Sequence, residues 1–197
     1  MMRKFLLGLT GSIGMGKSTT SAMFAAEGIP VWDADAVVHK LYAKGGAAVA
    51  PIGAVHPEAI VDGAVSRPAL KAVIGANPAA LAGIEAIIHP LVAADRAAFI
   101  ATSDADLIVL DIPLLFENGT EQTVDATLLV TAPAALQRQR VLARPGMTEA
   151  HLALILARQM PDADKRKRAT HIVETLDIPS TQAYVRALIT YIRGSHA

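Results

Sequence analysis

A phosphate-binding sequence near the N-terminus constrains this chain more than any other feature. The pattern G-x-x-x-x-G-K-[ST] is met by Gly11, Gly16, Lys17 and Ser18. The apolar run at residues 4–9 is typical of a buried strand, and residues 18–27 carry the apolar spacing of an amphipathic helix. The strand, loop and helix that this motif requires therefore follow one another in the correct order.

The backbone of such a loop determines its chemistry. Gly11 and Gly16 are expected to adopt angles that a Cβ atom would forbid, so that successive N–H groups turn inward around an anion. We expect the donors to come from Gly14, Met15, Gly16, Lys17, Ser18 and Thr19. Lys17 would reach the β- and γ-phosphates, and the Ser18 hydroxyl would ligate Mg²⁺. A glycine-rich turn with an incidental lysine is the alternative, but the flanking strand and helix favour a nucleoside-triphosphate site.

Composition narrows the class of protein. Lys+Arg and Asp+Glu both number 18, which gives a formal net charge of zero and no whole-chain basic field for a nucleic acid. Cysteine is absent, so disulfides, thiolate zinc sites and thiol nucleophiles are excluded. We find no signal-peptide pattern and no apolar run near the ~18 residues of a membrane helix. We therefore expect a cytoplasmic protein without nucleic-acid or membrane partners, and its oligomeric state stays open.

Further apolar runs predict the rest of the sheet. Short strands are expected near residues 29–32, 107–110, 125–131 and 171–173, with helices between them. This alternation predicts an α/β fold: a P-loop parallel five-stranded sheet flanked by helices. The predicted nucleotide-binding core comprises residues 1–33, 102–135 and 169–197.

Two connections are too long for simple crossovers. Residues 34–101 carry helix patterns and are interpreted as a helical insertion that binds a second ligand, with a long helix from near Pro78 past Ala98. Residues 136–168 are rich in arginine and are interpreted as a mobile helical lid, in which Thr148 caps a helix that runs to Met160.

Several segments together resemble dephospho-coenzyme A kinase, over about residues 5–191. They are Leu9–Ser18, Asp33–Asp35, Ile88–Val92, Asp111–Glu117, Arg144–Thr148 and Arg158–Pro161. The resemblance implies ATP-dependent phosphorylation of the ribose 3′-hydroxyl of dephospho-CoA to give CoA and ADP, the final step of coenzyme A synthesis. It also implies a P-loop core, a helical CoA-binding domain and a lid. Ser12 and Met15 depart from the residues usual in the loop, but at positions where only the backbone N–H is needed.

Two aspartates follow predicted strands. Asp33 stands where doubly wound sheets place ligands, so it could accept the proton of the attacking hydroxyl or could simply cap the next helix. The resemblance favours the catalytic role. Asp111 could hold Mg²⁺ through water or be a turn residue at a strand end.

Arginines in the expected lid are candidates for stabilising the transferred phosphoryl group. Arg140 and Arg144 lie one helical turn apart, and either could deliver a positive charge when the lid closes, as Lys17 does from the loop. The usual alternative is a solvated helix face. Residues 165–168, Lys-Arg-Lys-Arg, are interpreted as such a surface.

Candidate substrate residues outside the loop are fewer. His89 precedes a proline on an apolar helix and could be a substrate contact or a core histidine. Leu115 could pack on the CoA side of the cleft and Glu117 could order it, but a buried loop plug would have the same sequence.

Other functions fit less well. A GTPase needs Asn-Lys-x-Asp and Asp-x-x-Gly motifs, and neither occurs in the sequence. An ATP-driven nucleic-acid machine needs interleaved aromatic residues, which make up only 4% of the chain. A nucleoside monophosphate kinase, or another P-loop small-molecule kinase, remains as the alternative.

Overall fold

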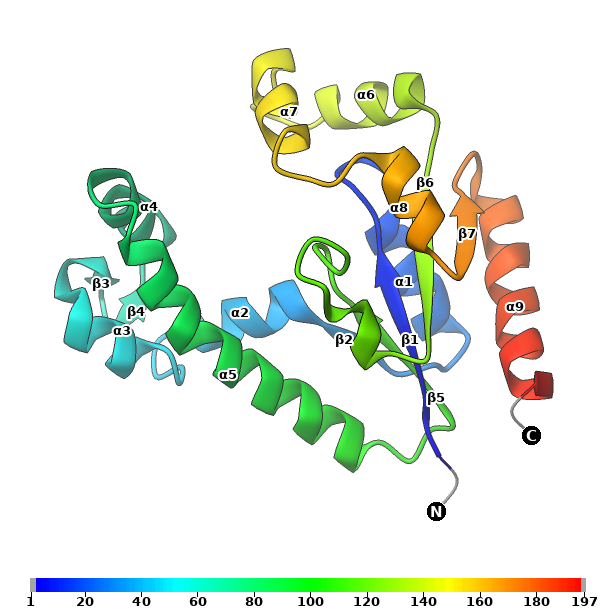
Figure 1. Ribbon diagram of the computed structural model, residues 1–197, viewed down its shortest axis with the longest axis horizontal. Coiled ribbons are helices and arrows are strands. Elements are labelled where there is room, and N and C mark those ends of the chain that lie inside the picture. The colour runs from blue at the N-terminus through cyan, green and yellow to red at the C-terminus, as the bar shows by residue number, and fades with distance from the viewer. Residues whose placement is uncertain (1–2, 196–197) are drawn as a thin grey trace. The chain divides into compact units, whose positions relative to one another are not determined.

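The computed structural model describes residues 3–195, and its contacts divide the chain into two units. The first takes in the chain up to Trp32 and again from Asp104 onwards, and the second runs from Asp33 to Ser103. Figure 1 shows the elements of both.

A five-stranded sheet forms the centre of the first unit, with strand order β2-β5-β1-β6-β7. The strands are β1 (Phe5–Thr10), β2 (Val31–Asp33), β5 (Leu107–Asp111), β6 (Ala126–Thr131) and β7 (His171–Glu174). Pairing is parallel between β1 and β5, β1 and β6, and β6 and β7. Every residue of β5 and β6 is buried, as expected for inner strands covered on both faces. The predicted α/β fold with a P-loop parallel sheet is confirmed.

Helices complete the first unit. They are α1 (Lys17–Ala26), α6 (Ala134–Leu142), α7 (Glu149–Leu156), α8 (Asp162–Arg168) and α9 (Ile178–Ser195). A short 3₁₀ helix spans Thr120–Thr123. The main hydrophobic cluster joins the sheet to α1 and α9, with Phe24, Val109 and Val185 all fully buried. Thr148 caps α7 by accepting from the His151 N–H, as expected, but α7 ends at Leu156, four residues before the predicted end at Met160.

The second unit is mostly helical. Its helices are α2 (Ala34–Tyr42), α3 (Val49–Val55), α4 (Arg67–Ala76) and α5 (Ala80–Thr102), with a 3₁₀ turn at Pro57–Ala59. Its only strands among the described residues are the two-residue β3 (Ile60–Val61) and β4 (Ala64–Val65). The expected long helix is present as α5, which contains Pro90. Among residues 3–195, no helix is long and apolar enough to cross a bilayer.

Candidate active site

The predicted phosphate loop joins β1 to α1. Gly14 and Gly16 have φ of 76° and 91°, in the left-handed region that disfavours any side chain. Gly16 is the N-cap of α1, so the loop leads directly into the first turn of that helix. The loop backbone therefore lies at the positive end of the α1 dipole, where anions bind.

Backbone N–H groups of the loop lack intramolecular acceptors. Among residues 3–195, none is found for the N–H groups of Gly14, Gly16, Lys17, Ser18 and Thr19. The N–H of Met15 differs from the prediction, because it donates to the Ser12 carbonyl at 3.2 Å. Five consecutive or nearly consecutive donors thus remain available, as a bound phosphate chain requires.

Gly11 is needed for close packing and not for a special backbone conformation. It does not have a positive φ, so the expectation of special backbone angles there is wrong. A Cβ atom at this position would lie 2.6 Å from the Val130 carbonyl oxygen. Glycine is required at position 11 because β6 approaches the loop closely.

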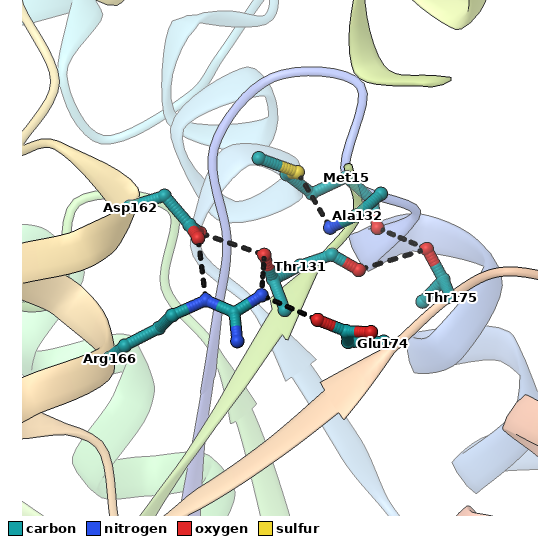
Figure 2. A network of polar contacts seen from close by, with 7 residues as sticks. All are labelled: Met15, Thr131, Ala132, Asp162, Arg166, Glu174 and Thr175. Carbon is teal, nitrogen blue, oxygen red and sulfur yellow. Dashed lines mark hydrogen bonds and ion pairs between the residues drawn. The ribbon is translucent and has the colours of Figure 1, made fainter. Parts of the chain in front are cut away.

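Thr175, the residue that follows β7, holds the phosphate loop at Met15 (Figure 2). The Thr175 hydroxyl donates to the Met15 carbonyl at 2.7 Å, and its N–H donates to the Thr131 carbonyl at 2.9 Å. The Met15 sulfur accepts from the Ala132 N–H at 3.0 Å. Met15 is only 3% exposed, so this departure from the usual loop residue is accommodated by packing against the end of β6.

A second set of contacts at the end of β6 involves α8 (Figure 2). The Arg166 guanidinium donates to Asp162 at 2.8 Å and to Glu174 at 2.7 Å. It also donates to the Thr131 hydroxyl at 3.2 Å, and that hydroxyl donates to Asp162 at 2.9 Å. These ion pairs raise the pKa of Arg166 above its usual value. Arg166 therefore links α8 to β6 and β7.

The prediction that residues 165–168 form a solvated surface is wrong at its first position. Lys165 is fully buried, with its Nζ 2.9 Å from Glu117 Oε1. The same oxygen accepts from the Met160 N–H at 2.9 Å. Burial raises the pKa of Glu117, but the Lys165 ammonium and the Met160 N–H outweigh it and hold the pKa below its usual value. Helix α8 is thus anchored to the loop after β5.

Lys17, which follows Gly16, is paired with the Asp111 carboxylate at the end of β5. The Lys17 side chain is 16% exposed and that of Asp111 only 2%. Ser18, the next residue of α1, is exposed. The lysine and the carboxylate that were predicted to handle phosphate and metal are therefore in contact at the end of β5, and Ser18 follows the lysine in the first turn of α1.

A pocket of about 320 Å³ adjoins the loop. It is lined by Gly14, Gly16, Thr19, Thr20, Met23, Arg140, Arg144, Thr175, Leu176, Asp177, Ile178 and Thr181. Arg140 is anchored there, because its guanidinium donates to the hydroxyl and the carbonyl of Thr175 at 2.9 and 2.5 Å. Arg144 is exposed, and its guanidinium has no partner among residues 3–195. Of the two arginines in the predicted lid, Arg140 is therefore held by hydrogen bonds, whereas the Arg144 guanidinium is not, among the described residues.

Asp33 ends β2 and is the N-cap of α2, so the predicted alternative of helix capping is confirmed. Its Oδ1 accepts from the N–H groups of Asp35 and Ala36 at 2.8 and 3.0 Å. Its Oδ2 has no partner among the described residues, and the side chain is exposed. Capping therefore leaves one carboxylate oxygen of Asp33 available for another interaction.

The remaining predicted site residues are placed as follows. Leu115 is fully buried and lies over Gly8, so the loop-plug alternative describes it and a substrate contact from it is not supported. Glu117 orders the same loop through Lys165 and Met160. His89 is exposed on α5, so the core-histidine alternative is wrong.

The sequence analysis missed four residues that shape the loop and its surroundings: Gln137, Gln159, Lys165 and Thr175. Gln137 carried a usable signal, because it stands four residues before the buried Val141 and so on the same face of α6. Gln159 lies within the Arg158–Pro161 segment of the resemblance, whereas Lys165 and Thr175 carried no signal, since their roles depend on contacts far apart in the sequence.

Comparison with known proteins places the chain in a family. The dephospho-CoA kinase family model matches residues 5–178. Dephospho-CoA kinases from Cereibacter sphaeroides and Ruegeria pomeroyi are 64% and 53% identical over 192 residues, covering 98% of each chain. A crystal structure of a Thermus thermophilus protein superposes with a TM-score of 0.86 at 34% identity, over 96% of this chain and 98% of that one. This chain belongs to the dephospho-CoA kinase family.

Proposed function

We propose that this chain transfers the γ-phosphoryl group of ATP to the ribose 3′-hydroxyl of dephospho-CoA, giving CoA and ADP in the last step of coenzyme A synthesis. The observation that carries the proposal is the set of unpartnered N–H groups at the N-terminus of α1, in a chain of this family. Such donors suit a triphosphate and give the predicted phosphate chemistry a physical basis. The cytoplasmic location is part of the same proposal.

The pocket beside the loop supports binding of the rest of ATP. Its volume of about 320 Å³ lies in the range of small-molecule sites. Met23, Leu176 and Ile178 give it apolar surface, and Leu176 and Ile178 are 54% and 60% exposed. We assign the nucleobase to this pocket, because it continues directly from the phosphate-binding N–H groups of Gly14 and Gly16.

Mg²⁺ fits the residues at the end of β5. This ion takes oxygen ligands, usually one or two protein carboxylates or hydroxyls completed by water and substrate phosphates. The exposed Ser18 hydroxyl and the Asp111 carboxylate are donors of that kind. When bound, the ion would neutralise charge on the phosphates. Lys17 is proposed to leave Asp111 and bind the β- and γ-phosphates.

Asp33 is proposed to accept the proton of the attacking hydroxyl. As the 3′-oxygen forms its bond to the γ-phosphorus, the bond from that phosphorus to the β–γ bridging oxygen breaks, and ADP leaves with those electrons. The hydroxyl proton passes to Asp33, whose Oδ2 is not used in capping. The two N–H bonds to Oδ1 fix the carboxylate in one orientation.

We assign the second unit, which holds the predicted 34–101 insertion, to dephospho-CoA, and His89 remains a candidate contact within it. The 136–168 segment is proposed as the lid that excludes water, which would otherwise accept the phosphoryl group. Arg144 is the arginine free to reach the phosphates, while Arg140 holds the pocket wall. Hydrogen exchange over residues 143–158 should slow when ADP and dephospho-CoA bind together, and unchanged exchange would remove the lid from the proposal.

ADP release from Mg²⁺-ATP, with and without dephospho-CoA, tests the function. Strong stimulation by dephospho-CoA, with CoA as the product, is expected. Stimulation by AMP or CMP instead would leave a P-loop kinase and overturn the acceptor. No nucleotide-dependent turnover with any acceptor would overturn the proposal as a whole.

A further inference from the structure

The tip of the phosphate loop is held by two glutamine side chains. Gln137 Nε2 donates to the Ile13 carbonyl at 2.8 Å. Gln159 Oε1 accepts from the Ile13 N–H at 3.2 Å. Gln137 lies in the first half of α6 and Gln159 follows α7, so two separate segments of the predicted lid contact one residue of the loop.

The bond from Gln137 fixes a peptide plane. In a trans peptide, the carbonyl of one residue and the N–H of the next point in opposite directions. No described peptide bond is cis. The Gly14 N–H is therefore directed away from Gln137 as long as that side chain holds the Ile13 carbonyl. Without this bond, glycine at position 14 could reorient its peptide planes at little cost.

Gln159 acts on the preceding peptide plane. That plane carries the Ser12 carbonyl and the Ile13 N–H. The carbonyl accepts from the Met15 N–H, and the Ile13 N–H is held by Gln159. Both peptide planes that flank the Ile13 α-carbon are thus fixed by bonds that do not involve a ligand.

Helix α6 packs closely against the loop at Gly14. A Cβ atom at Gly14 would lie 2.5 Å from Val141 Cγ2 and 3.0 Å from the Gln137 carbonyl oxygen. Gln137 itself is only 7% exposed. A polar side chain buried to this extent, with its amide on a loop carbonyl, is placed by the fold and is not a surface residue.

We propose that Gln137 and Gln159 are positioning residues for the triphosphate, because they hold the Ile13 peptide planes so that the Gly14 N–H and the N–H groups after it stay available to phosphate. The inference rests on the proposed function only for its catalytic measurements. It assigns no contact with substrate to either glutamine. Their effect passes through the backbone of Ile13.

Variants with side chains of similar size distinguish positioning of the loop N–H groups from a general contribution to folding stability. Gln137→Met and Gln159→Met keep side-chain length but remove the donor and the acceptor. Gln139→Met is the matched control, because Gln139 lies on α6, is exposed and forms no described side-chain bond. The measurements are the ADP dissociation constant with Mg²⁺ by calorimetry, and the KM values for ATP and dephospho-CoA.

Each glutamine variant should weaken ADP binding and raise the KM for ATP by about 3- to 10-fold, as loss of one hydrogen bond implies. The KM for dephospho-CoA should stay within about twofold, as should every value for Gln139→Met. A purely structural role would loosen both substrates alike. ADP binding within twofold of wild type in both variants, or equal changes in both KM values, would overturn the inference.

Folding is checked by thermal unfolding of each variant. If Gln137→Met does not fold, the half-buried Gln159 still carries the test, since its substitution leaves no buried cavity. A wild-type chain that binds ADP but does not phosphorylate dephospho-CoA would overturn the proposed function. The ADP measurements would still decide the role of the two glutamines.

Discussion

The ammonium of Lys17, the first residue of α1, is paired with the carboxylate of Asp111 at the end of β5, so the charge of the loop lysine is neutralised within the chain. Both groups have proposed partners in the bound state: phosphate for Lys17 and Mg²⁺ for Asp111. In the proposed bound state, the Lys17–Asp111 ion pair would be replaced by an interaction of Lys17 with phosphate and one of Asp111 with the metal. We therefore expect nucleotide and Mg²⁺ to bind cooperatively.

Asp111→Asn should separate the two roles. The concentration of Mg²⁺ for half-maximal activity should rise about 10- to 100-fold, because a metal-site carboxylate is lost. Affinity for ATP in the presence of EDTA should stay the same or increase, because Lys17 is no longer neutralised. A Mg²⁺ titration and metal-free ATP calorimetry provide the test. Unchanged Mg²⁺ dependence would leave Asp111 as a structural partner of Lys17.

Asp33→Asn should lower kcat by about 10²- to 10⁴-fold, because an amide cannot accept the hydroxyl proton. Asparagine caps a helix about as well as aspartate, so α2 and the thermal stability should be retained. The control is Asp35→Asn, in the first turn of the same helix, which should leave kcat nearly unchanged. Full activity in Asp33→Asn would reduce Asp33 to a helix cap.

Arg140 and Arg144, the two arginines of the proposed lid, should respond differently to the same substitution. Arg144→Gln should lower kcat with little effect on unfolding, because its guanidinium has no described partner. Arg140→Gln should also lower the melting temperature, because it deprives the Thr175 carbonyl of its donor. Steady-state kinetics and calorimetric melting measure the difference. Equal kinetic and thermal effects in the two variants would contradict it.

Glu117→Gln should destabilise the chain by about 3–5 kcal/mol, because Lys165 would remain buried without a counter-charge. The double variant with Lys165→Met should recover most of this loss in urea unfolding. As a control, Arg138→Gln removes an exposed pair with Glu149 and should cost less than about 1 kcal/mol. A single variant as stable as wild type would show that the buried pair contributes little.

The same pair sets part of the acid sensitivity. Because the Glu117 pKa is lowered in the folded chain, its contribution is present above the unfolded value of 4.5 and is lost as the pH falls through the folded pKa. The double variant should therefore lose less stability than wild type below pH 4.5. Parallel stability curves for the two proteins in acid would contradict this.

His171 should make stability depend on pH nearer neutrality. Its ring lies edge-on to Tyr191 with centroids 5.9 Å apart, and burial lowers its pKa below the usual 6.5. The unfolded chain then binds a proton at a higher pH than the folded chain, so stability falls as the pH drops through about 6.5. His171→Phe should flatten the urea midpoint between pH 7 and 5. His151→Phe, at an exposed position, should not.

Local patterns in the sequence predicted the sheet, the loop and most helices. The strands β5 and β6 were recognisable because inner parallel strands are continuous apolar runs. The cap at Thr148 was recognisable because it depends on neighbours within one turn. The end of α7 was misplaced because the helix continues into turns, in which the Arg158 and Gln159 N–H groups donate to carbonyls three residues earlier.

The candidate site was less predictable where its chemistry depends on contacts between distant parts of the chain. Lys165 stands in a run of four basic residues, and nothing in that run marks the one whose partner is Glu117. The two functions considered for Asp33 could not be separated by residue type, because both use the same carboxylate. The structure shows that capping uses Oδ1, and among residues 3–195 it gives Oδ2 no hydrogen-bond partner.

The glycines of the phosphate loop have a consequence for protein engineering. A Cβ atom at Gly16 would lie 2.9 Å from the Thr175 hydroxyl, and one at Gly11 would meet β6. The conformation of the phosphate loop therefore depends on β6 and on Thr175, both of which lie outside the motif. Grafting residues 8–19 alone onto another strand and helix would transfer the sequence motif but not the backbone conformation of the loop. A portable module would have to include β6 and the turn at Thr175 as well.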